Sequence, residues 1–198
     1  MGLLLGLAGP LAEKCGNPDC VTLNAVFSSG WSWACYAFLV GYLRRSKIES
    51  ALLSSLGLAV GVVAYYLFKY LSPTIPAGLE SGAVSEGISS GMFVWGIAAF
   101  ILGAPLGLFG NLARIPGVGG LPFRLVVPFV TFFETSMRLA TEADRQRVVV
   151  EITWTVIRFI AAAVALALVG HTIRSWWHAR RTHSSGSDEH RAGEISSV

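Results

Sequence analysis

The sequence is poor in charged residues, which make up 14% of its 198 positions, whereas soluble domains average about 25%. Its mean hydropathy is +0.59, and several apolar runs of roughly 20 residues are long enough to cross a bilayer. These features exclude an ordinary soluble domain. They predict an all-α, multi-pass transmembrane helical bundle, because a helix satisfies its own backbone polar groups in lipid.

Several patterns that mark other classes of protein are also lacking. The three cysteines show no Cys-x-x-Cys or Cys/His spacing suited to zinc, and no Asp-rich motif is present for binding a metal–diphosphate complex. We therefore expect neither a metal nor another cofactor. The net charge is only +3, and no arginine-rich face interleaved with aromatics lies outside the apolar runs. Nucleic acid is thus not an expected partner.

The apolar runs predict about six helices. The first is too short to span, since a spanning helix needs about 20 residues, and five helices remain if it does not cross. We expect a polar loop at 72–87, a bundle over residues 1–173 and a polar tail over 174–198, disordered beyond Arg181. The helices are predicted at about residues 2–12, 21–43, 49–71, 88–110, 121–139 and 148–173.

Two local patterns make structural predictions. Cys15 and Cys20 flank the turn-forming sequence GNPD, and they form a disulfide if this loop is outside the cell or remain thiols if it is not. Gly103 and Gly107 are four residues apart within GAPLGLFG. This spacing lets a neighbouring helix approach closely.

Lysine and arginine bias near the helix ends predicts the orientation. With both termini inside, nine basic residues lie on the inner side and five on the outer side, which indicates a cell-membrane protein with a cytoplasmic C-terminus. The inner set is Arg44, Arg45, Lys47, Arg114, Arg124, Arg174, Arg180, Arg181 and Arg191; the outer set is Lys14, Lys69, Arg138, Arg145 and Arg147.

One acid, Glu134, lies within the apolar stretch LVVPFVTFFETSMRL. A charged residue at the centre of a membrane helix costs about 2.5–3.5 kcal/mol on insertion scales, so an acid there is a functional-site candidate. The alternative is a structural ion pair with Arg138, one turn later, or with Arg158. We expect Arg138 to lie at the outer membrane edge, where its side chain reaches water and leaves Glu134 unpaired.

The predicted topology brings other polar and aromatic groups to the depth of Glu134. We expect an aromatic-walled cavity in the outer half of the bundle, with Glu151 or Glu86 as a second acid. The alternatives are that the aromatics form interfacial belts, that Glu151 complements a helix dipole, and that Glu86 is a solvated loop residue. The predicted walls are Trp31, Trp33, Tyr65, Tyr66, Phe93, Trp95 and Trp154.

A carboxylic acid in an aromatic site favours particular chemistry. Burial keeps a carboxyl group protonated and makes it a proton donor, while aromatic faces stabilise cations. This combination suits proton-initiated cyclisation of an isoprenoid chain. We expect such a cyclase on these grounds. The alternatives are a proton relay in a small permease, which the lack of a convincing internal repeat disfavours, and a structural or partner-binding membrane subunit.

Parts of the sequence resemble a group of small, mostly uncharacterised bacterial integral membrane proteins, over roughly residues 21–170. The resemblance rests on FSSGWSWACYAFLVGYLRR (27–45), Tyr65-Tyr66, GAPLGLFG (103–110) and the acid in the next helix. Size and layout also resemble bacterial membrane-bound terpene cyclases of the drimentine type. That resemblance implies a metal-independent cyclase acting on a prenylated natural product, with Glu134 as proton donor and Glu151 or Glu86 as second acid.

Overall fold

The computed structural model describes residues 2–14, 17–72, 81–142 and 148–195, without the side chains at 18, 81–89, 142 and 179–195. Of the residues in these ranges 92% are helical, and no strand occurs among them. This confirms the predicted all-α class. The helices are α1 (Gly2–Glu13), α2 (Pro18–Phe27), α3 (Gly30–Leu43), α4 (Lys47–Leu71), α5 (Ser81–Leu112), the 3-10 helix η1 (Gly117–Gly120), α6 (Leu121–Glu142) and α7 (Val148–Ile195).

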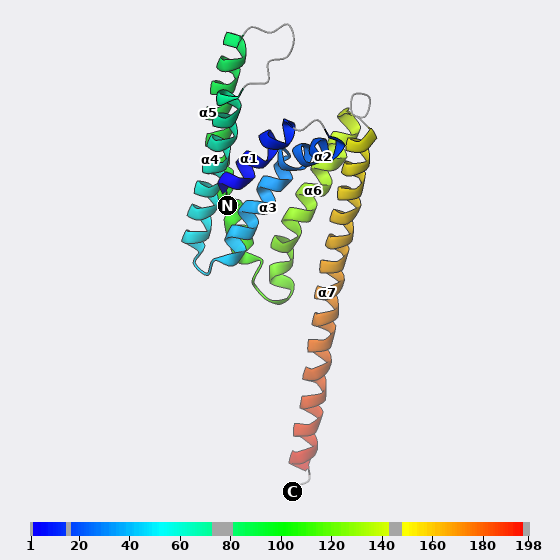
Figure 1. Cartoon of the computed structure of the whole chain (residues 1–198). Helices are drawn as coiled ribbons and strands as arrows, with labels where there is room; N and C mark the ends of the chain where they lie inside the picture. Colours follow the sequence, from blue (N-terminus) through cyan, green and yellow to red (C-terminus); the bar gives the residue numbers. More distant parts are fainter. Residues whose placement is uncertain (1, 15–16, 73–80, 143–147, 196–198) are drawn as a thin grey trace.

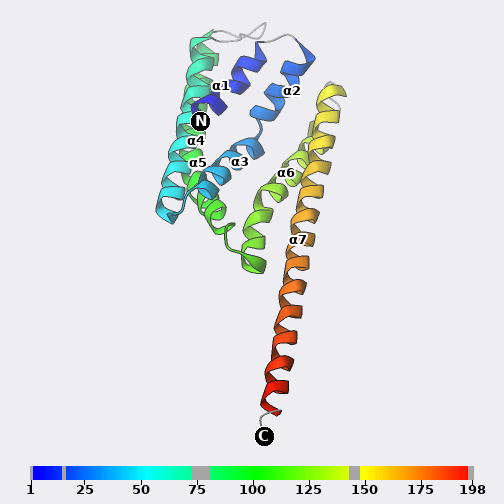
Figure 2. The ribbon, with the colours of Figure 1, turned by 60° about the horizontal axis from the view of Figure 1, so that its bottom comes forward.

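Within the described residues, four segments are long and apolar enough to cross a membrane. In Figures 1 and 2, α4 and α5 lie side by side at one edge of the bundle, α6 and α7 at the other, and α3 runs between them. The C-terminal part of α7 extends beyond the other helices. The four candidate spans are Lys47–Leu71, Ser90–Leu112, Gly117–Thr141 and Val148–His178.

The predicted second helix, 21–43, is divided into α2 and α3, and this accounts for seven α-helices in the described ranges where about six were expected. Ser29 adopts an extended backbone (φ −85°, ψ 147°) and is the N-cap of α3. The Ser28 hydroxyl donates to Asn24 Oδ1 at 2.9 Å, and the Ser29 hydroxyl donates to the carbonyl of Val26. Serine side chains compete in this way with helical backbone hydrogen bonds, so the pair Ser28-Ser29 interrupts the helix.

Two other predicted boundaries differ from the structure. The helix α5 begins at Ser81, within the predicted loop at 72–87, which places Glu86 in a helix, although its side chain is outside those described. The helix α7 continues to Ile195, past the point where disorder was predicted. No proline interrupts 148–195, so helical turns can propagate from the apolar part of α7. The domain division at residue 173 remains a prediction.

Small residues determine how closely the helices pack. A Cβ at Gly103 would lie 2.6 Å from Ser55 Cα, and one at Gly107 would lie 2.4 Å from the Ser50 carbonyl oxygen. The predicted close approach of another helix to these glycines is therefore confirmed, and that helix is α4. The buried Ser54 hydroxyl donates to the carbonyl of Ala37 at 2.8 Å, which ties α4 to α3.

Glycines also allow α1 to pack closely against the middle of α4. A Cβ at Gly2 or Gly6 would lie 2.1 Å from the carbonyl oxygen of Gly57 or Gly61, respectively. With 12 residues, α1 is about 18 Å long at 1.5 Å per residue. It is therefore a short helix packed on α4, as the sequence suggested.

Candidate functional site: the break between α2 and α3

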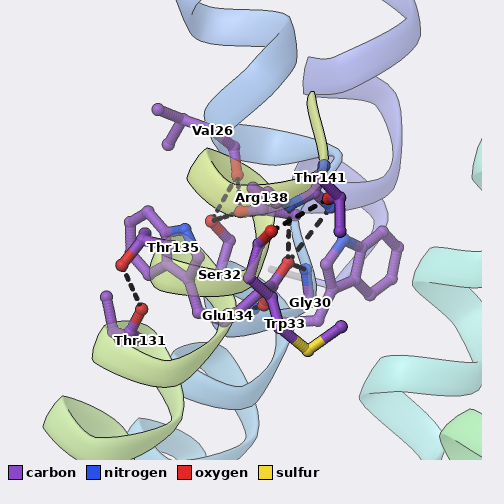
Figure 3. Close-up of polar contacts among 12 residues, drawn as sticks. Val26, Gly30, Ser32, Trp33, Thr131, Glu134, Thr135, Arg138 and Thr141 are labelled. Carbon is purple, nitrogen blue, oxygen red and sulfur yellow. Dashed lines mark hydrogen bonds and ion pairs between the residues drawn. The ribbon is translucent and has the colours of Figure 1, made fainter. Parts of the chain in front are cut away.

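The first backbone N–H groups of α3 are bound by a side chain from α6. Gly30 N–H donates to Glu134 Oε1 at 2.9 Å, and Trp31 N–H donates to Oε2 at 2.7 Å. Figure 3 shows Glu134 beside Gly30 at the break. A helix N-terminus has unsatisfied donors and a partial positive charge. The Glu134 carboxylate is therefore an anionic cap for α3.

The same carboxylate is paired with Arg138, one turn further along α6. Arg138 Nε and NH2 each lie 3.1 Å from Glu134 Oε1. The expectation that Arg138 turns to water and leaves Glu134 unpaired is wrong. The Glu134 side chain is 22% exposed, and a partly buried carboxylate gains from a charge-assisted partner. The alternative expectation, a structural pair, is the one observed.

Trp154 of α7 completes this cluster. Its side chain is 1% exposed, and Arg138 Cζ lies 5.1 Å from its ring centroid, within the range of a cation–π contact. The indole N–H groups of Trp154 and Trp31 are both buried without a hydrogen-bond partner. Buried donors of this kind are uncommon. Trp31 thus reaches the cluster through its backbone N–H and Trp154 through its ring.

Side chains of α3 bind the other side of the break, where α2 ends. Trp33 Nε1 donates to the carbonyl of Phe27 at 3.0 Å, and Ser29 and Ser32 hydroxyls both donate to the carbonyl of Val26. Trp33 also packs against Gly61 of α4. Trp33 therefore stabilises the break, and both interrupted helix ends have partners.

Other predicted site residues lie elsewhere. Phe93 and Trp95 are 67% and 59% exposed, because α5 packs on its neighbours through its glycine-rich face. Their exposure places both side chains on the outer surface of α5, and their convergence with Glu134 stays a prediction. Glu151 is exposed on α7, and Arg158 stacks over Phe159 with Cζ 5.6 Å from the ring centroid. The Glu86 side chain falls outside those described.

Tyr65 and Tyr66 form a separate cluster. Their rings are T-shaped at 5.2 Å, and Lys69 Nζ lies 5.2 Å from the Tyr65 ring centroid. Tyr65 packs near Gly9 of α1, and Tyr66 packs near Gly91 of α5. This pair therefore lies at the contacts of α4 with α1 and α5.

Two predictions concern cysteine and metal sites. Cys15 is outside the described residues, so the proposed disulfide with Cys20 stays a prediction. Within the described ranges, no group of three His, Cys, Asp or Glu side chains is placed to hold a metal ion.

Comparison with known proteins adds no assignment. No family model, curated protein or solved structure matches this chain. The function is therefore argued from the cluster of Glu134, Arg138, Trp31 and Trp154 at the break.

Proposed function

We propose that this protein is a small proton-coupled membrane carrier for organic anions. The observation that carries the proposal is the position of the Glu134 carboxylate, shared between the N-terminus of a broken helix and an arginine. Glu134 lies seven residues before Thr141, the end of an apolar span, which is about 10 Å along the helix. Broken helices and ionisable residues at such depth are typical of transport pathways.

The proposed mechanism exchanges one anion for another. Protonation of Glu134 removes its negative charge and weakens its bonds to Gly30, Trp31 and Arg138. Those N–H groups then donate to an anionic group of the substrate, because a helix N-terminus and a guanidinium both bind carboxylates. The unpartnered indole N–H groups of Trp31 and Trp154 supply further donors. Loss of the proton restores the internal pair and displaces the substrate.

We also propose that the carrier lies in the cell membrane with its C-terminus in the cytoplasm. The connections 44–46 and 113–116 lie at one end of the bundle (Figure 1), and Arg44, Arg45 and Arg114 are exposed there. Positive charge on short connections favours the cytoplasmic side.

The transport proposal is tested with purified protein in liposomes under an inward proton gradient. The probes are impermeant anions: succinate, glutamate and benzenesulfonate. We expect wild-type protein to accumulate at least one of them above the level of protein-free liposomes. Glu134→Gln should lose proton-driven accumulation, because its amide cannot bind and release the coupling proton.

Glu151→Gln is the matched control, since it removes an exposed carboxylate from α7. It should accumulate the probe as wild type does. Wild-type uptake no greater than in empty liposomes, or unchanged accumulation by Glu134→Gln, would contradict the carrier proposal.

Proton-initiated cyclisation of a prenylated substrate is a second candidate. It is favoured by the buried Trp154 ring, which already holds the Arg138 cation beside the carboxylate and would stabilise a carbocation by the same quadrupole. Its proton donor would be Glu134 in a conformation released from Arg138. In the observed conformation that carboxylate accepts hydrogen bonds from three groups, and for this reason the carrier is preferred.

The cyclase hypothesis has its own assay. Membranes that contain the protein would be incubated with a farnesylated aromatic substrate, and the products analysed for a cyclised isomer of unchanged mass. Product formation should disappear in Glu134→Gln, and its loss in Glu151→Gln would identify Glu151 as the second acid. Wild-type turnover by the Gln variant would exclude Glu134 as the acid.

A further inference from the structure

Two connections at one end of the bundle are joined into a single surface. Asn111 Nδ2 and Arg114 NH1 both donate to the carbonyl oxygen of Arg44, at 2.6 and 3.1 Å. Arg124 donates to two carbonyl oxygens of the connection that follows α5, at 2.8 and 2.9 Å. These bonds hold residues 43–48 and 114–118 together as one surface, called here the basic platform.

The basic platform displays cations that are not neutralised. Arg44, Arg45, Lys47 and Arg114 are all exposed. Among the described side chains, the ion pairs are Lys69–Glu13 and Arg138–Glu134, and neither involves this group. The platform therefore has positive charge available for an external anion.

Large apolar side chains lie among these cations. Leu43, Ile48 and Val118 are 76%, 72% and 54% exposed. Exposed apolar side chains next to cations suit the boundary between acyl chains and headgroups, where the apolar groups enter lipid and the charges remain near phosphate.

At the opposite end of the bundle, the described lysines interact with other groups of the protein. Lys69 is paired with Glu13 at 3.3 Å. Lys14 is hydrogen-bonded to Ser72 and lies 5.4 Å from the Phe68 ring centroid. The two lysines described at that end are thus engaged within the protein, whereas no bond is described for the side chains of Arg44 and Arg45 at the basic platform.

We infer that the basic platform binds the headgroups of anionic phospholipids. This inference does not depend on the carrier proposal, because it uses none of the residues at the helix break. Juxtamembrane cations attract anionic lipid by roughly fivefold in affinity per residue. Among the cations, Arg44 and Arg45 are suited to a test because their side chains are exposed and make no described bond.

The experiment uses detergent-solubilised full-length protein, with bound lipid counted by native mass spectrometry. The probes are dioleoylphosphatidylglycerol and dioleoylphosphatidylcholine. Wild-type protein should prefer the anionic lipid, and the double variant Arg44→Gln/Arg45→Gln should bind it about 30-fold more weakly. Phosphatidylcholine binding should not change, which shows that the variant is folded.

Two further variants serve as controls for the effect of charge and of its position. Arg44→Lys/Arg45→Lys keeps both charges and should retain the preference, while Lys14→Gln/Lys69→Gln removes two cations from the other end and should also retain it. An unchanged preference in Arg44→Gln/Arg45→Gln would overturn the inference. Full competition by glycerol 3-phosphate would also overturn it, because the platform would then be a site for a soluble phosphate.

Discussion

At the scale of single residues, Glu134 connects three elements of the fold. Its carboxylate accepts from two N–H groups of α3 and pairs with Arg138, which stacks on Trp154 of α7. Glu134 is therefore central to the structure whichever function is correct. A role in proton transfer adds to this structural role, and experiments need to separate the two.

Replacement of Glu134 by alanine should lower the free energy of unfolding by about 2 kcal/mol, because α3 loses its cap and Arg138 loses its partner. Arg138→Ala should lower the free energy of unfolding by a smaller amount, since Glu134 keeps two backbone donors. Combined in a double-mutant cycle, the two changes should show a coupling of about 1 kcal/mol or more. Reversible unfolding in mixed micelles measures these values, and strictly additive effects would show that the pair contributes nothing.

At the scale of helices, the small residues of α5 and α4 determine which faces meet. The Gly103 and Gly107 face packs against serines of α4, and consequently Phe93 and Trp95 point outward. The rotation of α5 about its own axis thus decides which of its side chains face α4 and which face outward. Depth along a helix can be estimated from sequence, but rotation about the helix axis depends on its neighbours.

This packing gives a matched pair of substitutions within α5. A Cβ at Gly107 would meet Ser50 O at 2.4 Å and Ser54 Oγ at 2.5 Å, whereas at Gly96 it would meet nothing within 4 Å. Gly107→Ala should destabilise the protein by about 1–3 kcal/mol through overpacking. Gly96→Ala should stabilise it by up to about 1 kcal/mol through helix propensity. Equal effects in thermal unfolding would argue against the α4–α5 contact.

At the scale of the whole molecule, the spans place the connections at two ends. The connections 44–46 and 113–116 lie together at one end, and the C-terminal ends of α4 and α6 lie towards the other (Figures 1 and 2). The short α1 and α2 pack beside the spans. The difference in positive charge is therefore a difference between these two ends of the bundle.

The orientation can be measured with single cysteines after Cys15, Cys20 and Cys35 are replaced by serine. Ser72→Cys, at the end of α4, should react with a membrane-impermeant maleimide in intact cells. Arg45→Cys, at the basic platform, should react only after permeabilisation. The reverse pattern would place the basic platform outside the cell.

The sequence alone determined the all-α class, the long apolar segments that form α4, α5, α6 and α7, and the close approach at Gly103 and Gly107, and it singled out Glu134 as a candidate. These properties depend on composition, length and local spacing, which act within one segment. The Ser28-Ser29-Gly30 sequence also carried a signal for the helix break, since serine is a common N-cap, but the long apolar run around it favoured one continuous helix.

Only the tertiary structure decided what Glu134 contacts. Gly30 and Trp31 are 104 and 103 residues away from it in the chain, and their contribution comes from backbone N–H groups, which leave no side-chain pattern. The pairing with Arg138 was a local possibility, and in the structure Arg138 also contacts the Trp154 ring of α7. Rotation of each helix and burial of each charge are properties of the assembled bundle, and no single segment specifies them.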